Sequence, residues 1–372
     1  MNRRIWLQQS ALTLTGLSIA GSKPALARRV AHKVTPHLAT AIRLNANENP
    51  YGPSALAQEA MQKALARSNR YPGDLEEELI SRIAEQEGLT PDHVLLGPGS
   101  SELLELAGTW FGKPGVEILT ADITFSLLQT YARRAGAQVV EVPLDTNFRY
   151  DLAAIQRKLK EATGLVYIVN PNNPTSTALP AEVLLSFCQK TAAHTPVMVD
   201  EAYLEFVAEP NYPSMVQCIP QGHDVLVVKT FSKIYGLAGL RVGYLLAQPE
   251  RIAALKALQF GWFNQSNVAL AAAMATYQEE GFISLSRRKN EEAREITRAA
   301  LRSMDIIPAQ SETNFIFFEI PKERFSPDLT PLMAEHNLII RSAPNPQGFW
   351  YRVSMGRPDE MEMFAKTFTS LL

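Results

Sequence analysis

The sequence predicts an α/β fold in two parts: a large domain with a mostly parallel sheet flanked by helices, and a smaller α+β domain. From about residue 53, short runs of β-branched and apolar residues alternate with segments whose apolar residues recur at helical spacing. Continuous apolar runs, such as residues 225–228, are typical of strands buried on both faces. Beyond about residue 249, longer helical segments accompany fewer strands, which marks the second part.

The expected elements follow from these two patterns in chain order. In the first part, helical spacing predicts helices over residues 56–66, 75–86, 101–111, 125–135, 152–160 and 181–193, and short apolar runs predict strands over residues 94–96, 116–119, 138–142, 165–169, 197–199, 225–228 and 243–246. In the second part, the same criteria predict helices over residues 252–258, 268–280, 285–304 and 329–336 and strands over residues 314–319, 338–341 and 350–353. We therefore expect the large domain to cover residues 49–255 and the small C-terminal domain to cover residues 256–372.

The N-terminus has the composition of a targeting segment. A basic start with Arg3 and Arg4 precedes an uncharged apolar stretch over residues 10–21, and Ala25 to Ala27 forms a small-x-small cleavage site. We interpret residues 1–27 as a twin-arginine signal peptide, which is read by a receptor and leaves no stable membrane insertion after cleavage. The expected location is periplasmic or secreted; the alternative is an incidental basic N-terminus on a cytoplasmic protein. Residues 28–48 are expected to form an irregular N-terminal arm.

Composition limits the classes of partner. The chain has 372 residues, 20% of them charged, and a net charge of −2. This balance gives no electrostatic reason to expect nucleic acid as a partner, whereas a few arginines in a cleft could still bind an acidic small molecule. The two cysteines, Cys188 and Cys218, form neither a disulfide framework nor a zinc cluster, and no metal site is expected.

Four polar clusters stand where predicted strands stop, and ligands in open α/β sheets bind beyond those ends. The first is GPGSSE over residues 97–102, before a predicted helix. Its glycines allow close backbone approach, and Ser100, Ser101 and the helix N-terminus favour an anion, so this is a candidate phosphate cradle. The alternative is an ordinary glycine turn in which Ser100 or Ser101 caps the helix.

The second and third clusters supply polar groups beside the first. NPNNPT over residues 170–175 reads by itself as an Asn/Pro turn, but at a sheet edge Asn173 could donate to a phenolate-like oxygen. DEAY over residues 200–203 follows a buried strand, and the carboxylate of Asp200 would need a cation or a donor there. A pyridinium nitrogen is one such partner; the alternative for Asp200 is a helix cap.

The fourth cluster is TFSKIYGLAGLR over residues 230–241. Lys233 could form an imine with an aldehyde cofactor and later act as a general base. Ser232 and Arg241 could hold a phosphate through charge-assisted hydrogen bonds. A lysine taken alone is usually a solvated surface group, and the pattern of serine, lysine, small residues and arginine is what distinguishes this one.

Together these segments resemble the class I/II aminotransferases that depend on pyridoxal 5′-phosphate, and most closely the histidinol-phosphate aminotransferases. The resemblance covers most of the chain after residue 27. It is carried by LNANENP at residues 44–50, RYP at 70–72, the three motifs around Asn173, Asp200 and Lys233, SETN at 311–314 and YRVS at 351–354. It implies the fold type I of pyridoxal-phosphate transferases.

The resemblance also implies roles for single residues. Lys233 would form the Schiff base with pyridoxal 5′-phosphate, and Asp200 would pair with the pyridine nitrogen and keep it protonated. The other implied contacts are Asn173 and Tyr203 to the ring hydroxyl, Ser100, Ser101, Ser232 and Arg241 to the phosphate, Phe125 stacked on the ring, Tyr71 to the phosphate of a neighbouring subunit, Arg352 to the substrate carboxylate, Arg341 near the distal end of the substrate, and Asn47 on the substrate side. The contact through Tyr71 implies a homodimer with shared active sites.

Two departures from the family pattern concern the substrate. Phe125 stands where the family usually has tyrosine, so stacking is kept and a hydroxyl contact is lost. His37 stands where the family has a tyrosine that helps to hold the phosphate of histidinol phosphate. We therefore expect an aminotransferase for an amino acid or amino alcohol, with an oxo acid as acceptor, whose donor is left open.

Two other functions are kept as alternatives. A decarboxylase or lyase of the threonine-phosphate decarboxylase type would use the same scaffold. A non-catalytic protein that binds pyridoxal phosphate or an amino acid is the third hypothesis. The complete set of Lys233, Asp200 and Arg241 argues against a degenerate site.

Overall fold

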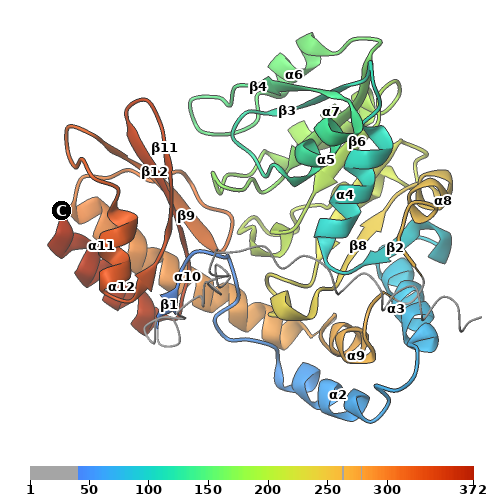
Figure 1. Cartoon of the computed structure of the whole chain (residues 1–372), viewed down its shortest axis with the longest axis horizontal. Coiled ribbons are helices and arrows are strands. Elements are labelled where there is room, and N and C mark those ends of the chain that lie inside the picture. The colour runs from blue at the N-terminus through green and yellow to red at the C-terminus, as the bar shows by residue number, and fades with distance from the viewer. Residues whose placement is uncertain (1–40, 262–263, 278) are drawn as a thin grey trace, which may run out of the picture. The chain divides into compact units, whose positions relative to one another are not determined.

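The computed structural model describes residues 41–261, 264–277 and 279–372 (Figure 1). The predicted signal peptide, most of the predicted arm and His37 lie outside these described residues. Within them the strands form one sheet of seven strands, one of three and a pair of two.

The seven-stranded sheet carries the polar clusters at one edge. Its strands, in spatial order, are β2 (Val94–Gly97), β8 (Gly243–Leu246), β7 (Val225–Thr230), β6 (Val197–Asp200), β5 (Thr163–Val169), β3 (Glu117–Ala121) and β4 (Gln138–Val142). Only the pairings of β8 with β2 and β7 are antiparallel. The beginning of β8 therefore lies at the edge where the other six strands end, so that residues just before β8 reach the same place as residues just after β5, β6 and β7.

Alternate strand residues enter separate apolar clusters on the two faces of this sheet. Val166 and Ile168 of β5 belong to one cluster, and Leu165, Tyr167 and Val169 belong to the other. The helices of the first face are α3 (Gly73–Gln86), α6 (Leu152–Lys158), α7 (Ala181–Thr191) and α9 (Asn267–Thr276), and those of the second are α4 (Ser100–Phe111), α5 (Leu127–Ala135) and α8 (Pro249–Lys256). This burial on both faces is why the strand runs are apolar throughout.

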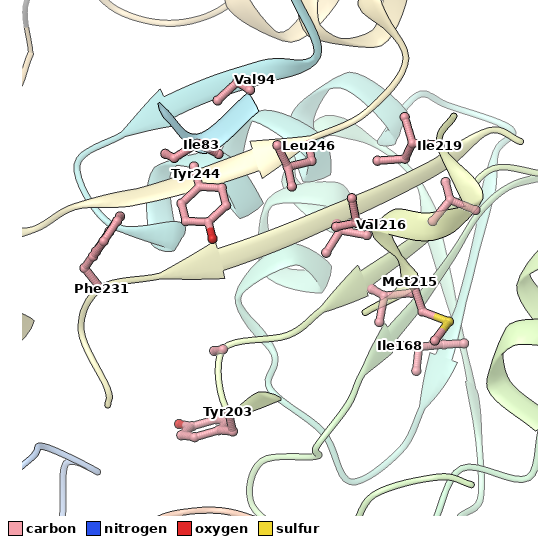
Figure 2. Packing of buried hydrophobic residues seen from close by; sticks show 14 of the residues in the cluster. Ile83, Val94, Ile168, Tyr203, Met215, Val216, Ile219, Phe231, Tyr244 and Leu246 are labelled. Atoms are coloured by element: carbon pink, nitrogen blue, oxygen red, sulfur yellow. The ribbon is translucent and has the colours of Figure 1, made fainter. Parts of the chain in front are cut away.

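Figure 2 shows part of the cluster on the first face, where Tyr244 and Leu246 of β8 lie among Ile83, Val94 and Val216. A buried ion pair lies on the same face. Nζ of Lys229 in β7 is 2.9 Å from Oε1 of Glu87, just beyond α3, and 3.8 Å from Oε2 of Glu201. Because Glu201 follows Asp200 directly, the two neighbouring acids project to opposite faces of the sheet. Glu201 takes part in this buried ion pair, whereas Asp200 lines the cavity described below.

The second sheet is an antiparallel set of β11 (Arg341–Pro344), β12 (Gly348–Ser354) and β9 (Phe315–Pro321). The helices α10 (Glu280–Ser303), α11 (Leu329–Glu335) and α12 (Pro358–Leu371) accompany it (Figure 1). A separate apolar cluster joins this sheet to α12 through residues such as Phe318, Phe364 and Phe368.

The expected strand over residues 338–341 is wrong as a single element. The chain forms β10 (Leu338–Ile339), which pairs in parallel with β1 (Ile42–Arg43), and then β11, which turns back on β12. The sequence analysis also missed β1 and α12. β1 has only two residues and, within the described part of the chain, its pairing partner is the distant β10.

The helices of the first part agree in type with the sequence analysis and differ at their ends. The expected helix over 125–135 begins only at Leu127, which leaves Phe125 in the segment before it. The helix α2 (Ala55–Leu65) packs closely against α9, and α9 also contacts α3. The domain boundary near residue 255 stays a prediction. Among the described residues, no helix is both long and apolar enough to span a bilayer.

Candidate active site

A cavity of about 300 Å³ lies at the edge of the large sheet where most of its strands end. Twelve of the residues predicted for the site line it: Asn47, Ser100, Ser101, Phe125, Asn173, Asp200, Tyr203, Ser232, Lys233, Arg241, Arg341 and Arg352. Tyr71 is not among its lining residues, and its side chain is 80% exposed. The topology therefore brings together residues from both ends of the chain.

One end of the cavity is built to hold an anion. The guanidinium of Arg241 reaches the hydroxyl of Ser232 through Nη1 and that of Ser101 through Nη2, each at 3.3 Å. Arg241 stands just before the reversed strand β8, and Ser101 stands in the first turn of α4. Hydroxyls, a guanidinium and a helix N-terminus are the donors that phosphate prefers.

The helix start beside this cradle has no side-chain cap. The residue that precedes α4 is Gly99, at φ 77°, and no side chain accepts a hydrogen bond there. The alternative reading, in which Ser100 or Ser101 caps the helix, is therefore wrong. A Cβ at residue 99 would collide with the Arg241 guanidinium, so glycine is required by both the backbone angle and the space. The first N–H groups of α4 remain directed toward the cavity end.

Asp200 closes β6 as a buried acid, with a side chain in the cavity wall and a residue exposure of 3%. Its Oδ1 accepts from the N–H of Ala202 at 3.1 Å, and its Oδ2 accepts from the hydroxyl of Tyr167 at 3.2 Å. It caps no helix, because the short helical turn that follows begins only after Tyr203. Both of these partners are neutral, so the carboxylate lacks a cation at hydrogen-bond distance within the described residues.

Burial dominates the electrostatics of this acid. It raises the pKa of Asp200 to about 6, while the Ala202 N–H, the Tyr167 hydroxyl and the charge of Lys233 act in the opposite direction. A cationic group placed in the cavity beside Asp200 would remove this cost. The site thus favours a ligand with a positive charge at this point.

Lys233 lines the same cavity as Asp200. It stands in the loop after β7, and its Nζ lies 3.4 Å from the carbonyl oxygen of Ala46 and 5.7 Å from the centre of the Tyr203 ring. The residue is partly exposed toward the cavity. An amine that lines the cavity can form an imine with a carbonyl compound bound there.

Hydrogen-bond directions fix two donors at a third point of the cavity. Arg352 donates through Nη1 to Oδ1 of Asn173 at 2.7 Å, which turns the amide nitrogen of Asn173 the other way. Asn47 donates through Nδ2 to the hydroxyl oxygen of Tyr203 at 2.9 Å, so the Tyr203 proton is left for another acceptor. Asn173 and Tyr203 each therefore keep a donor for a molecule bound in the cavity.

Asn47 is itself held rigidly. It adopts φ 54°, its Oδ1 accepts from the hydroxyl of Ser354 at 2.8 Å, and its carbonyl oxygen accepts from the side chain of Asn314 at 3.1 Å. Its side chain is directed at Tyr203 as well as at the wall predicted to face substrate. The sequence analysis missed this role, and also missed Ser354, because the contact joins residues 307 positions apart.

The substrate side of the cavity carries two arginines. Arg341 and Arg352 are register partners across β11 and β12, and both line the cavity. Burial lowers the pKa of Arg352, as does the charge of Arg341 to a smaller extent. Nε of Arg352 is buried with no hydrogen-bond partner in the described part of the chain. Phe125, 37% exposed, supplies an aromatic surface at the same cavity.

The residues present fit the cofactor that the resemblance implies. An anion cradle, an amine, the two donors of Asn173 and Tyr203, and a buried acid that lacks a cation among the described residues all line one cavity. Pyridoxal phosphate offers a phosphate, an aldehyde, a ring hydroxyl and a ring nitrogen to these four groups. The sequence analysis missed Tyr167, which donates to Asp200, because a tyrosine inside a buried strand is usually a residue of the hydrophobic core.

Comparison with known proteins gives a consistent family. A family model described as aminotransferase class I and II matches residues 39–368. A histidinol-phosphate aminotransferase of Moorella thermoacetica is 34% identical over 336 residues, covering 89% of this chain and 85% of the relative. Histidinol-phosphate aminotransferase 2 of Pseudomonas fluorescens is 35% identical over 337 residues, covering 90% of both chains.

Solved structures show the same fold. A protein from Erwinia carotovora atroseptica, assigned to the histidinol-phosphate aminotransferases, superposes with a TM-score of 0.84 at 33% identity and covers 90% of this chain and 96% of its own. The histidinol-phosphate aminotransferase of Sinorhizobium meliloti, solved with pyridoxal 5′-phosphate, has a TM-score of 0.80 at 24% identity, covering 92% and 100%.

The burial of Asp200 predicts that the free energy of unfolding of the cofactor-free protein depends on pH. Folding raises the pKa of the Asp200 carboxyl from 3.8 to about 6. The contribution of this carboxyl to the free energy of unfolding is therefore fully present below its unfolded-state pKa, and it is lost as the pH rises through about 6. The difference corresponds to about 3 kcal/mol at most. In the cofactor-free protein, Asp200→Asn should therefore increase the free energy of unfolding above about pH 7 and have little effect near pH 4.

Urea denaturation of the cofactor-free proteins at both pH values measures this effect. Asp122→Asn is the matched control, because it removes an exposed aspartate just after β3, a strand of the same sheet. Equal pH dependence of wild type and Asp200→Asn would show that the acid is not desolvated.

Proposed function

This chain belongs to the class I and II aminotransferases, and from that membership we infer that it transfers an amino group from an amino acid or amino alcohol to an oxo acid, with Lys233 and Asp200 at the reacting centre. Its cofactor is pyridoxal 5′-phosphate. The observation that carries the proposal is one cavity lined by an amine, a buried acid and an anion cradle.

The bound cofactor supplies an electron sink for the charge left when a Cα–H bond breaks. Asp200 keeps the ring nitrogen protonated, because a buried carboxylate at the end of β6 is stabilised by a cation beside it. Lys233 would hold the cofactor through its Nζ amine and, when released from it, would take up a proton from the substrate Cα as a general base.

Other residues orient the reacting groups. Tyr203 and Asn173 donate to the ring oxygen, since Asn47 and Arg352 occupy their alternative hydrogen-bonding positions. Arg352 binds the substrate carboxylate or its equivalent, for which its buried guanidinium has remaining donors. Ser100, Ser101, Ser232 and Arg241 would hold the phosphate, and Phe125 would offer its aromatic face to the ring.

The substrate class follows from Arg341. It is exposed, shares the cavity and lies beside Arg352, so a polar or anionic group at the far end of the substrate has a cationic partner. The relatives named above are histidinol-phosphate aminotransferases. We propose an amino acid or amino alcohol of this general kind, and the loss of the family's tyrosines at Phe125 and His37 leaves histidinol phosphate itself as one candidate among several.

Transamination is tested by the half-reaction. Amino donors added singly to the wild-type holoenzyme should convert the Schiff-base absorbance band to that of the pyridoxamine form. Lys233→Ala should lack the Schiff base with the protein and lose about 10³-fold or more in turnover, because the general base is removed. Release of carbon dioxide without that conversion would favour a decarboxylase. If no donor changed the absorbance band and none released carbon dioxide, the result would favour a binding protein.

Arg341→Gln tests the substrate class. For donors with an anionic distal group, kcat/KM should fall about 10-fold to 100-fold, the usual value of a hydrogen bond to a charged group. Donors with a neutral distal group should change by less than about threefold. The exposed Arg43→Gln is the matched control. An equal loss for both kinds of donor would contradict the assignment of Arg341 to the distal end.

We also propose a homodimer with shared active sites, in which Tyr71 of each subunit reaches the cavity of the other. The proposal is supported by the family and by the exposure of Tyr71 outside its own cavity. Mixing Tyr71→Ala subunits with Lys233→Ala subunits should restore activity, because a hybrid dimer would contain one complete site. A monomeric holoenzyme in light scattering would overturn it.

Export by the twin-arginine route is likewise proposed, on the composition of residues 1–27 alone. N-terminal sequencing of the protein from fractionated cells is the check. An uncleaved protein confined to the cytoplasm of cells with a working twin-arginine system would contradict it.

A further inference from the structure

Tyr167 lies behind the acid of the active site and has no role in the sequence analysis. It stands in β5 with its side chain fully buried. Its register partner in β6 is Met198, and that of Val169 is Asp200, so Tyr167 and Asp200 are diagonal neighbours on one face of the sheet. From this position the Tyr167 hydroxyl donates to Oδ2 of Asp200 at 3.2 Å.

The direction of this hydrogen bond is settled by charge. Burial and the nearby carboxylate raise the pKa of Tyr167 well above its usual value, so the phenol stays protonated and donates. The other carboxylate oxygen, Oδ1, accepts from the N–H of Ala202. The carboxyl group is thereby held at both oxygens, which sets its plane relative to the cavity.

The remaining polar groups near Asp200 have other partners. Lys233, from the loop after β7, lies near the carbonyl oxygen of Ala46. Tyr203, from Asp200's own segment, accepts from Asn47. Tyr150, just before α6, is bonded to the hydroxyl of Thr124 and to the N–H of Val169. In the described part of the chain, Tyr167 is the side-chain donor that is bonded to Asp200.

We propose that Tyr167 is a positioning residue for transamination: its hydroxyl keeps Asp200 ionised and aimed into the cavity, so that the acid holds a proton on the ring nitrogen. The inference rests on the proposed function, because it requires a cofactor ring between Lys233 and Asp200. The neutral phenol suits this task, since a cation in its place would compete with the ring nitrogen for the carboxylate. A phenylalanine in its place would leave Oδ2 with one donor fewer in a buried setting.

The test is a pH titration of the absorbance band of the holoenzyme, which reports protonation of the Schiff-base nitrogen. A positively charged ring nitrogen withdraws electrons from the Schiff base and so lowers the pKa of the Schiff-base nitrogen. In Tyr167→Phe the acid supports the ring proton less well, so the midpoint should rise by about half a pH unit, and kcat should fall about tenfold with KM within about twofold. Packing is kept, because the ring remains.

Tyr150→Phe is the matched control, since it removes another buried hydroxyl on the neighbouring segment without breaking a bond to Asp200. It should leave the midpoint unchanged. Site-specific 3-fluorotyrosine at position 167, a stronger donor of nearly the same shape, should move the midpoint downward, and it serves as the second variant should Tyr167→Phe not fold.

An unchanged midpoint in both Tyr167 variants, or an equal rise in Tyr150→Phe and Tyr167→Phe, would overturn the inference. In the Asp200→Asn background, Tyr167→Phe should have no further effect on the midpoint, and an undiminished effect there would also overturn it. A wild-type protein that shows no Schiff-base band would instead overturn the proposed function, so the two failures are distinguishable.

Discussion

The carboxylate of Asp200 is placed where water cannot solvate it, at the end of a strand whose other residues are fully buried. A buried acid is tolerated only if donors or a cation meet it, and Ala202 and Tyr167 supply the donors. A positively charged group bound in the cavity would stabilise the Asp200 carboxylate further. The burial that raises the pKa of Asp200 therefore favours a positively charged group at this point, which we propose to be the protonated ring nitrogen of the cofactor.

The arrangement depends on one reversed strand. Because β8 runs against its neighbours, Arg241 at its beginning arrives at the edge where β2, β6 and β7 end. The cradle at Ser101 and Ser232 is thereby completed by a residue that a purely parallel sheet would carry to the opposite edge. On the other side of the cavity, side chains of the second sheet determine which atoms of Asn173 and Tyr203 remain available to a ligand.

The residues proposed to hold the cofactor and those proposed to bind substrate lie on different elements of the molecule. The residues proposed to hold the cofactor come from the edge of the large sheet. Arg341 and Arg352, which are proposed to bind substrate, stand on an antiparallel hairpin of the second sheet. A hairpin and the loops around it can change without disturbing the buried strands.

The sequence by itself determined the alternation of strands and helices, the mostly parallel sheet and the four polar clusters, because periodicity and turn chemistry are local properties of a chain. It also predicted twelve of the residues that line the cavity, since the carboxyl ends of neighbouring parallel strands must meet at one edge. Tertiary structure alone decided the pairing of β1 with β10, the contact of Asn47 with Ser354 across 307 positions, and the split of residues 338–341 into two strands. It also decided the role of Tyr167, whose partner is set by the register of β5 on β6, a non-local choice that leaves no trace in either strand alone.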